Sequence, residues 1–190
     1  KRSVNIFVLS LIGFSVAFPA CIYLTRIIKA LFSMPAGVGT GILPIVYLSA
    51  LVLLPVGALH GLFFTLSCTI HNQITGKGTL STAHVYFKEM LGTIAGGILV
   101  SFFLIPYFNS YHSAFIVAFL SLAACAVFMY AFSISKSGKA ISIAAAALTT
   151  ATVLAFAFNV PGRIHSVSIA QQWNKQNVVF YENSIYQNVV

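Results

Sequence analysis

The apolar stretch at positions 85–108, VYFKEMLGTIAGGILVSFFLIPYF, constrains the fold of this chain more than any other segment. It is as long as the roughly 20 apolar residues that cross a bilayer as a helix, yet it carries Glu89 near its start. Gly92 and Gly96 lie four residues apart, a spacing that lets two helix backbones approach closely in lipid. Helical periodicity places Glu89 on the face of these two glycines. Because an unpaired carboxylate facing hydrocarbon costs at least a few kcal/mol, we expect this face to pack against protein inside a helical bundle.

The composition excludes an ordinary soluble domain. Of the 190 residues, 59% are hydrophobic and 6% are charged, whereas soluble domains carry about a quarter charged residues. Ten lysines and arginines stand against two acidic residues, but they are scattered between apolar blocks. This pattern is typical of helix ends beside lipid headgroups and does not indicate a nucleic-acid partner. The three cysteines form no CxxC motif, so we interpret them as packing residues.

The apolar stretches predict an all-α membrane protein, with a bundle of about five transmembrane helices over positions 1–160. The predicted spans are 4–25, 42–70, 85–108, 112–132 and 140–160. The second is longer than a bilayer needs, so we expect a kink at Pro55. The short uncharged link 109–111 predicts an antiparallel hairpin between the third and fourth spans. After the first span, Arg26 and Lys29 open a segment that we expect to lie along the membrane interface.

The tail at 161–190 differs from the rest, because it is polar from Pro161 onward. Its last part suggests two short β-rich pieces around Glu182 and Asn183. Two short strands are not stable alone in water, so we expect a linker and the start of a truncated soluble domain that continues after Val190.

Three motifs in chain order carry a resemblance to a known family. They are LLPVGALHGLFFTL at 53–66, VYFKEMLGTIAGGILVSFFLIP at 85–106, and the S-x-YQ-x-V pattern at 184–189. Arg26 and the Pro35-Ala36-Gly37 loop fit the same order of features. In these features, over nearly its whole length, the chain resembles the membrane half of bacterial membrane-bound spermidine synthase-like proteins.

The resemblance implies a fusion, in which a multi-pass module in the bacterial inner membrane anchors a Rossmann-like aminopropyltransferase domain. That domain would transfer an aminopropyl group from decarboxylated S-adenosylmethionine, its substrate, to a diamine such as putrescine. Tyr186 and Gln187 match the family's YQ pair, which implies that they help to line the substrate cleft. The family's glycine-rich nucleotide loop and acidic catalytic residues are absent from this sequence. We therefore expect no catalysis and no cofactor in this chain alone, with the lipid bilayer and the domain after Val190 as its partners.

Two polar residues within the spans are candidates for buried polar chemistry. Glu89 is a candidate proton or cation site, because intramembrane carboxylates are functional candidates by default. The alternative is that it lies one turn inside the helix end, neutralised by Lys88, Lys77 or a tyrosine hydroxyl. His60 lies in the middle of the second span without an obvious partner, and a backbone carbonyl freed by Pro55 is one candidate.

Three interpretations of function remain open. The leading one is the non-catalytic membrane module. A transporter would need a continuous polar path past Glu89 and His60. A structural subunit of a larger membrane complex, electron-transferring or homo-oligomeric, is the third. Its haem version needs two facing histidines from the set His60, His71, His84 and His112; interfacial histidines without a ligand role are the simpler interpretation.

Overall fold

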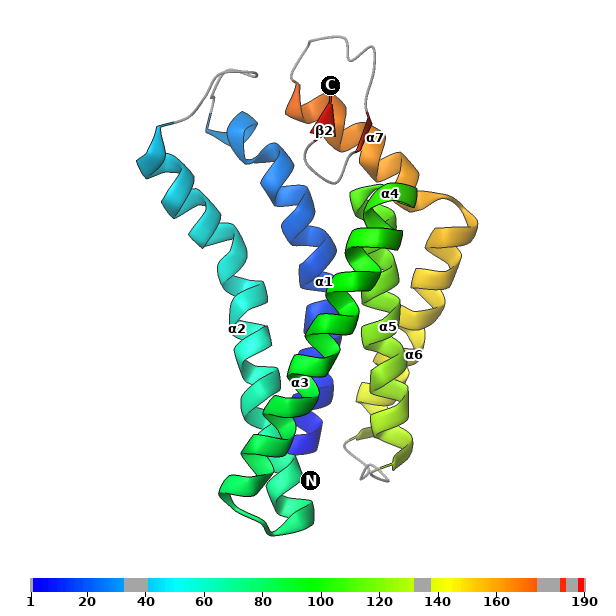
Figure 1. Cartoon of the computed structure of the whole chain (residues 1–190). Coiled ribbons are helices and arrows are strands. Elements are labelled where there is room, and N and C mark those ends of the chain that lie inside the picture. Colours follow the sequence, from blue (N-terminus) through cyan, green and yellow to red (C-terminus); the bar gives the residue numbers. More distant parts are fainter. Residues whose placement is uncertain (1, 33–40, 132–137, 174–181, 184–187, 190) are drawn as a thin grey trace.

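The computed structural model describes residues 2–32, 41–131, 138–173, 182–183 and 188–189. Its long helices in chain order are α1 (Arg2–Leu31), α2 (Ile42–Thr75), α3 (Thr79–Leu99), α5 (Ser110–Ala131), α6 (Gly138–Ala157) and α7 (Val160–Gln172). A π-helix, η1 (Val100–Leu104), and the short α4 (Ile105–Tyr107) extend α3 (Figure 1). Strands β1 (Glu182–Asn183) and β2 (Asn188–Val189) form an antiparallel pair.

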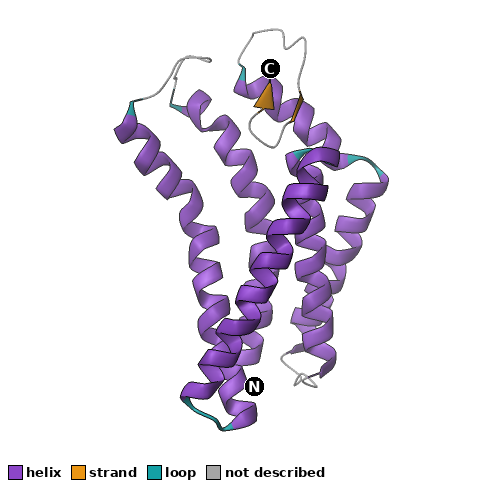
Figure 2. Ribbon diagram, in the orientation of Figure 1, coloured by secondary structure: helices purple, strands orange, loops and turns teal. Residues whose placement is uncertain are grey.

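The helical content agrees with the sequence, as the colouring of Figure 2 shows. Within the described ranges, five segments are long and apolar enough to cross a membrane. They are Ser3–Leu31, Ile42–Thr75, Thr79–Tyr107, Ser110–Tyr130 and Ala140–Ala157. The all-α prediction is confirmed, and the five segments fit a multi-pass membrane protein. β1 and β2 hold two residues each, which is too short to show a soluble domain. The soluble domain expected after them therefore stays a prediction.

The helix α1 lies at the centre of the bundle, packed along α2 on one side and α5 on the other (Figure 1). A core forms around its first half from Val4, Phe7, Val8, Ile70, Cys125 and Ala145. The ring of Phe7 lies 5.9 Å from that of Phe63 on α2 and 4.7 Å from that of Phe128 on α5. One aromatic side chain of α1 therefore joins both neighbouring helices.

The prediction that the third span lies inside the bundle is wrong for the residues that the structure describes. α3 packs mainly against α2, and a Cβ placed at Gly92 or Gly96 meets no side chain and no other helix within 4 Å. The predicted periodicity itself holds, since the α2-facing stripe runs through Ser81, Val85 and Glu89. The two helices separate with distance from the turn that joins them (Figure 1), so in the described part of the chain Gly92 and Gly96 meet no neighbouring helix.

The turn between α2 and α3 moves the start of the third helix. Gly76 and Gly78 have φ angles of 64° and 54°, which other residues rarely adopt. Asn72 supports the turn, because its side-chain oxygen accepts a hydrogen bond of 2.8 Å from the Gly78 N–H. The helix begins at Thr79 instead of position 85. Glu89 consequently lies about 15 Å along the helix from Thr79, at 1.5 Å per residue, and not one turn inside the end.

The end of α1 also differs from the expected interfacial segment. The helix continues without a break to Leu31, so Arg26 and Lys29 belong to the first span. α2 runs through Pro55 as one continuous helix, and the kink expected there stays a prediction. The Pro35-Ala36-Gly37 loop lies outside the described residues.

The end of the third span accommodates Pro106 by widening the helix. Proline has no N–H to donate to the carbonyl four residues earlier, and its ring crowds that carbonyl. The Ile105 N–H bonds to the Val100 carbonyl, five residues back, within the wider π-helical turn. The chain then reverses before Ser110, as the link predicts (Figure 1). However, α5 does not pack along α3, and a groove of about 320 Å³ lies between η1, α1 and α5.

The turn glycines give a direct test of this geometry. We expect Gly78→Ala to destabilise the fold by about 1–3 kcal/mol, because its positive φ strains any other residue. The matched control is Gly57→Ala, where an added Cβ meets nothing within 4 Å in the interior of α2. That change should be neutral or stabilising by up to about 1 kcal/mol. Thermal unfolding in detergent measures both, and equal losses would contradict the turn geometry.

Candidate functional site

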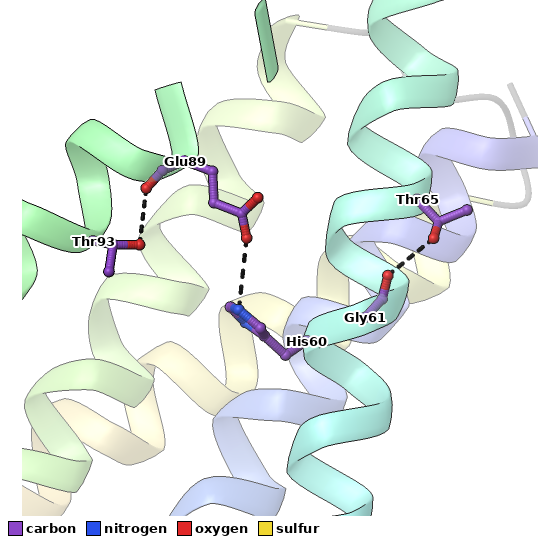
Figure 3. A network of polar contacts seen from close by, with 5 residues as sticks. All are labelled: His60, Gly61, Thr65, Glu89 and Thr93. Carbon is purple, nitrogen blue, oxygen red and sulfur yellow. Dashed lines mark hydrogen bonds and ion pairs between the residues drawn. The ribbon is translucent and has the colours of Figure 1, made fainter. Parts of the chain in front are cut away.

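The intramembrane polar pair joins α2 to α3. Oε1 of Glu89 lies 3.7 Å from Nε2 of His60, and the two side chains point toward each other (Figure 3). The hydroxyls of Thr93 and Thr65 donate to carbonyls of their own helices, at 2.9 Å and 3.0 Å. The two threonine hydroxyls therefore donate to backbone carbonyls and not to the Glu89 carboxylate or the His60 imidazole.

The exposure of this pair corrects the expectation of a buried site. The side chains of His60 and Glu89 are 69% and 36% exposed. The contact at 3.7 Å gives Glu89 a polar partner within the spans, although neither side chain is enclosed. The packing of Gly92 and Gly96 against another chain, in a homo-oligomer or a larger complex, stays a prediction.

The pair lies on a groove of about 460 Å³ between α2 and α3, which Phe128 of α5 also lines. Its lining combines charged or basic groups with a mostly apolar wall: His60, Phe63, Phe64, Ser67, Ile70, His71, Ile74, Val85, Lys88, Glu89 and Phe128. The polar groups are isolated among aromatic and aliphatic side chains. The described residues of this groove therefore do not form the continuous polar path that the transporter interpretation needs.

The remaining histidines do not pair as the haem interpretation requires. His71 and His84 do meet, but their rings stack 6.0 Å apart with planes 18° from parallel. This arrangement does not direct one nitrogen of each ring at a shared metal. His112 lies at the opposite end and contacts the Asn109 side chain at 2.8 Å. Among the described residues, no group of three or more histidine, cysteine or acidic side chains could hold a metal ion.

A second polar site, which the sequence analysis missed, surrounds Arg26. The residue is only 8% exposed. Its guanidinium donates to the hydroxyls of Ser168 at 2.8 Å and Ser110 at 3.3 Å, and it contacts Nδ1 of His165 at 3.1 Å. It also lies 5.1 Å from the centre of the Tyr111 ring, within range of a cation–π interaction. One cation of α1 thereby joins α5 and α7.

Burial, with the charge of Arg26 as a smaller cause, keeps the neighbouring His165 neutral. Burial, and then the charges of Arg26 and His112, lower the pKa of His165 to about 4. His165 is therefore neutral at pH 7, and its Nδ1 can accept a hydrogen bond from the guanidinium. This assigns the ring proton to Nε2.

The helix α7 corrects the expectation of a polar linker at 161–172. Asn159 adopts a left-handed conformation with φ of 50° after α6 ends, and Pro161 occupies the first turn of the new helix. Proline is favoured there because its missing N–H has no helical partner in the first turn. Pro161, Ser168 and Ile169 are buried against the bundle, and Tyr23 of α1 donates to the Gln171 side chain at 2.7 Å. Pro161 was the signal in the sequence that could have predicted this helix.

The predicted substrate-binding pair cannot be placed beside these sites. Tyr186 and Gln187 lie outside the described residues, so their role stays a prediction.

Comparison with known proteins gives one similarity of limited extent. The chain matches a polyamine aminopropyltransferase from Oceanobacillus iheyensis, with 31% identity over 86 residues. The match covers 45% of this chain and only 17% of the relative's length. No family profile and no solved structure matches the chain.

The depressed pKa of His165 predicts an acid-sensitive fold. The folded state holds the pKa at about 4, below the ordinary value of 6.5, so the unfolded chain binds more protons between these values. The contribution of neutral His165 to the free energy of unfolding is complete above about pH 6.5 and is lost as the pH falls toward 4. After allowance for solvent screening we expect a loss of order 1–2 kcal/mol. Thermal unfolding at a series of pH values measures it.

The variant His165→Gln should flatten this pH dependence, whereas His84→Gln, which changes an exposed histidine at the opposite end, should leave it unchanged. An unchanged profile in His165→Gln would show that another group titrates.

Proposed function

We propose that this chain is the membrane module of an aminopropyltransferase-like fusion protein. The module crosses the bacterial inner membrane several times and holds a soluble domain, following Val190, at the membrane surface. The similarity to a polyamine aminopropyltransferase and the five apolar helices support this proposal. The module itself does no chemistry; aminopropyl transfer from decarboxylated S-adenosylmethionine to a diamine belongs to the soluble domain, with Tyr186 and Gln187 at its opening.

The observation that carries the anchoring role is the fixation of α7 by Arg26. A helix packed on the bundle holds the start of the following segment at a defined place, whereas a flexible linker would leave it free to move. Because Ser168 and His165 both contact the buried guanidinium, α7 is tied to α1, the central helix. The chain after Gln172 therefore starts from a fixed point on the bundle.

Removal of the guanidinium tests the fixation of α7. We expect Arg26→Leu to cost about 2–3 kcal/mol, because the hydroxyls of Ser110 and Ser168 lose a charged partner. Trp173, the single tryptophan of the chain, follows α7 directly and has a buried indole nitrogen. Its emission should shift to longer wavelength, and a soluble quencher should reach it more readily.

The matched control is Arg163→Leu, the same chemical change at an exposed arginine on α7 itself. It should leave the emission of Trp173 unchanged. If both variants behave alike, Arg26 does not fix α7.

The function of the whole protein is tested on the complete reading frame that contains this chain. We expect the protein in the membrane fraction, with aminopropyl transfer to a diamine measured by mass spectrometry of the polyamine product. A version without residues 1–160, and without any span that precedes them in the reading frame, should release the activity into the soluble fraction. If the complete protein transfers no aminopropyl group, the assignment to aminopropyltransferases is wrong; if the activity stays in the membrane after the deletion, the anchoring role is wrong.

A further inference from the structure

We propose that a groove between the end of α1 and the start of α2 binds one anionic phospholipid. The groove has a volume of about 280 Å³. Its apolar wall includes Leu48 and Val52, and its polar lining consists of Lys29, Thr25 and Ser49. An ammonium group above an apolar wall is complementary to a lipid with a negative headgroup and a hydrocarbon chain.

The groove follows from the way in which α1 and α2 diverge. The two helices are joined where the Cys21 thiol donates to the Val52 carbonyl at 3.3 Å. From there they separate toward the end of α1 at Leu31 and the start of α2 at Ile42 (Figure 1). Leu48 and Val52 are 7% and 6% exposed, so they close the floor of the groove against α1.

The groove extends over about two thirds of the hydrocarbon depth of one leaflet. Ile45 lies at its upper end, in the first turn of α2, and Val52 lies seven residues further along the helix. Seven residues span about 10 Å, whereas half of a hydrocarbon core is about 15 Å thick. Lys29 stands in the last turn of α1, at the level expected for headgroups. The ammonium group can therefore meet a phosphate while the hydrocarbon chain lies below it.

The width of the groove selects a hydrocarbon chain over a protein helix. A volume of about 280 Å³ over about 10 Å of length gives a cross-section of roughly 28 Å². A helix with its side chains is about 10–12 Å in diameter, which is several times larger in area. A second copy of this chain could thus cover the groove but could not enter it.

The charge of the groove selects an anionic lipid. Among the described residues no acidic side chain lines it, and the half-buried Lys29 does. The other cation at this end of α1, Arg26, is 8% exposed and contacts α5 and α7 instead. The Ser49 hydroxyl can donate to a phosphate or ester oxygen beside the ammonium group. A zwitterionic lipid carries its own cation next to the phosphate, so the attraction of Lys29 favours phosphatidylglycerol over phosphatidylcholine.

The test uses the full chain in nanodiscs with equal amounts of phosphatidylglycerol and phosphatidylcholine. After extraction into mild detergent, native mass spectrometry counts the lipids that remain bound. We expect wild type to retain one phosphatidylglycerol in preference. Lys29→Gln should reduce this preference about fivefold, the effect expected of one basic residue at an anionic surface. The control Lys77→Gln, the same change at an exposed lysine at the opposite end, should retain the preference.

Ser49→Phe tests the apolar part of the site, because a large ring there fills the groove and should expel both lipids. Retention of phosphatidylglycerol by Lys29→Gln at the wild-type level would overturn the proposal. So would equal retention of both lipids by wild type. Displacement of phosphatidylglycerol by excess inorganic phosphate, as complete as displacement by phosphatidylglycerol vesicles, would identify a free-phosphate site instead. A lipid-free wild-type dimer would indicate that a second copy covers the groove.

Discussion

The contact between α1 and α5 is the interaction on which the other helices depend. Ala114 and Ala118 are 0% and 3% exposed, so the two backbones approach closely at these small residues. Along the same face, Ser121 and Cys125 donate to α1 carbonyls at 3.0 Å and 3.6 Å. Hydrocarbon offers no competing hydrogen-bond partner, so donors in a membrane bond within the protein. The resulting pair holds α2 on one side and α6 and α7 on the other.

The fold surrounds Arg26 and Glu89, two of the charged residues in its spans, in different ways. Arginine keeps its charge under all ordinary conditions, so a buried Arg26 needs groups that accept hydrogen bonds from its N–H groups. Two serine hydroxyls and the neutral His165 do this, beside the Tyr111 ring. Glu89 instead has His60 as its polar neighbour, and the pair remains open to a groove.

The comparison of Ala114 and Ala118 with Gly92 and Gly96 explains how far the sequence could predict the fold. Both pairs have small residues four positions apart, and helical periodicity assigns each to one face. Only the alanine pair meets another helix in the described part of the chain. The length of each apolar stretch predicts that a span exists, because it depends on local sequence. Which face is covered depends on the divergence of α2 from its neighbours, and no local pattern contains that.

The polar sites divide in the same way, into residues that the local sequence reveals and contacts that only long-range packing decides. The candidates Glu89 and His60 were visible as polar residues in apolar spans, but their contact required the α2–α3 turn. Arg26 was assigned to the headgroup region because it stands close to Lys29 near the end of a span. Its actual role depends on α7, which returns to the bundle more than 130 positions later, since Arg26 and Ser168 are 142 residues apart in sequence. Long-range contacts of this kind leave only a weak local signal, here the proline that begins α7.

The last two turns of α1 carry two basic residues that are close in sequence but have different surroundings. Arg26 and Lys29 are three residues apart and lie within about 60° of each other around the helix, at 100° per residue. That difference is enough to direct Arg26 toward α5 and α7 and Lys29 toward the groove beside α2. One cation contacts α7, the helix that leads out of the bundle, and the other lines the groove that we propose binds lipid. Both environments therefore depend on the same rotational setting of α1.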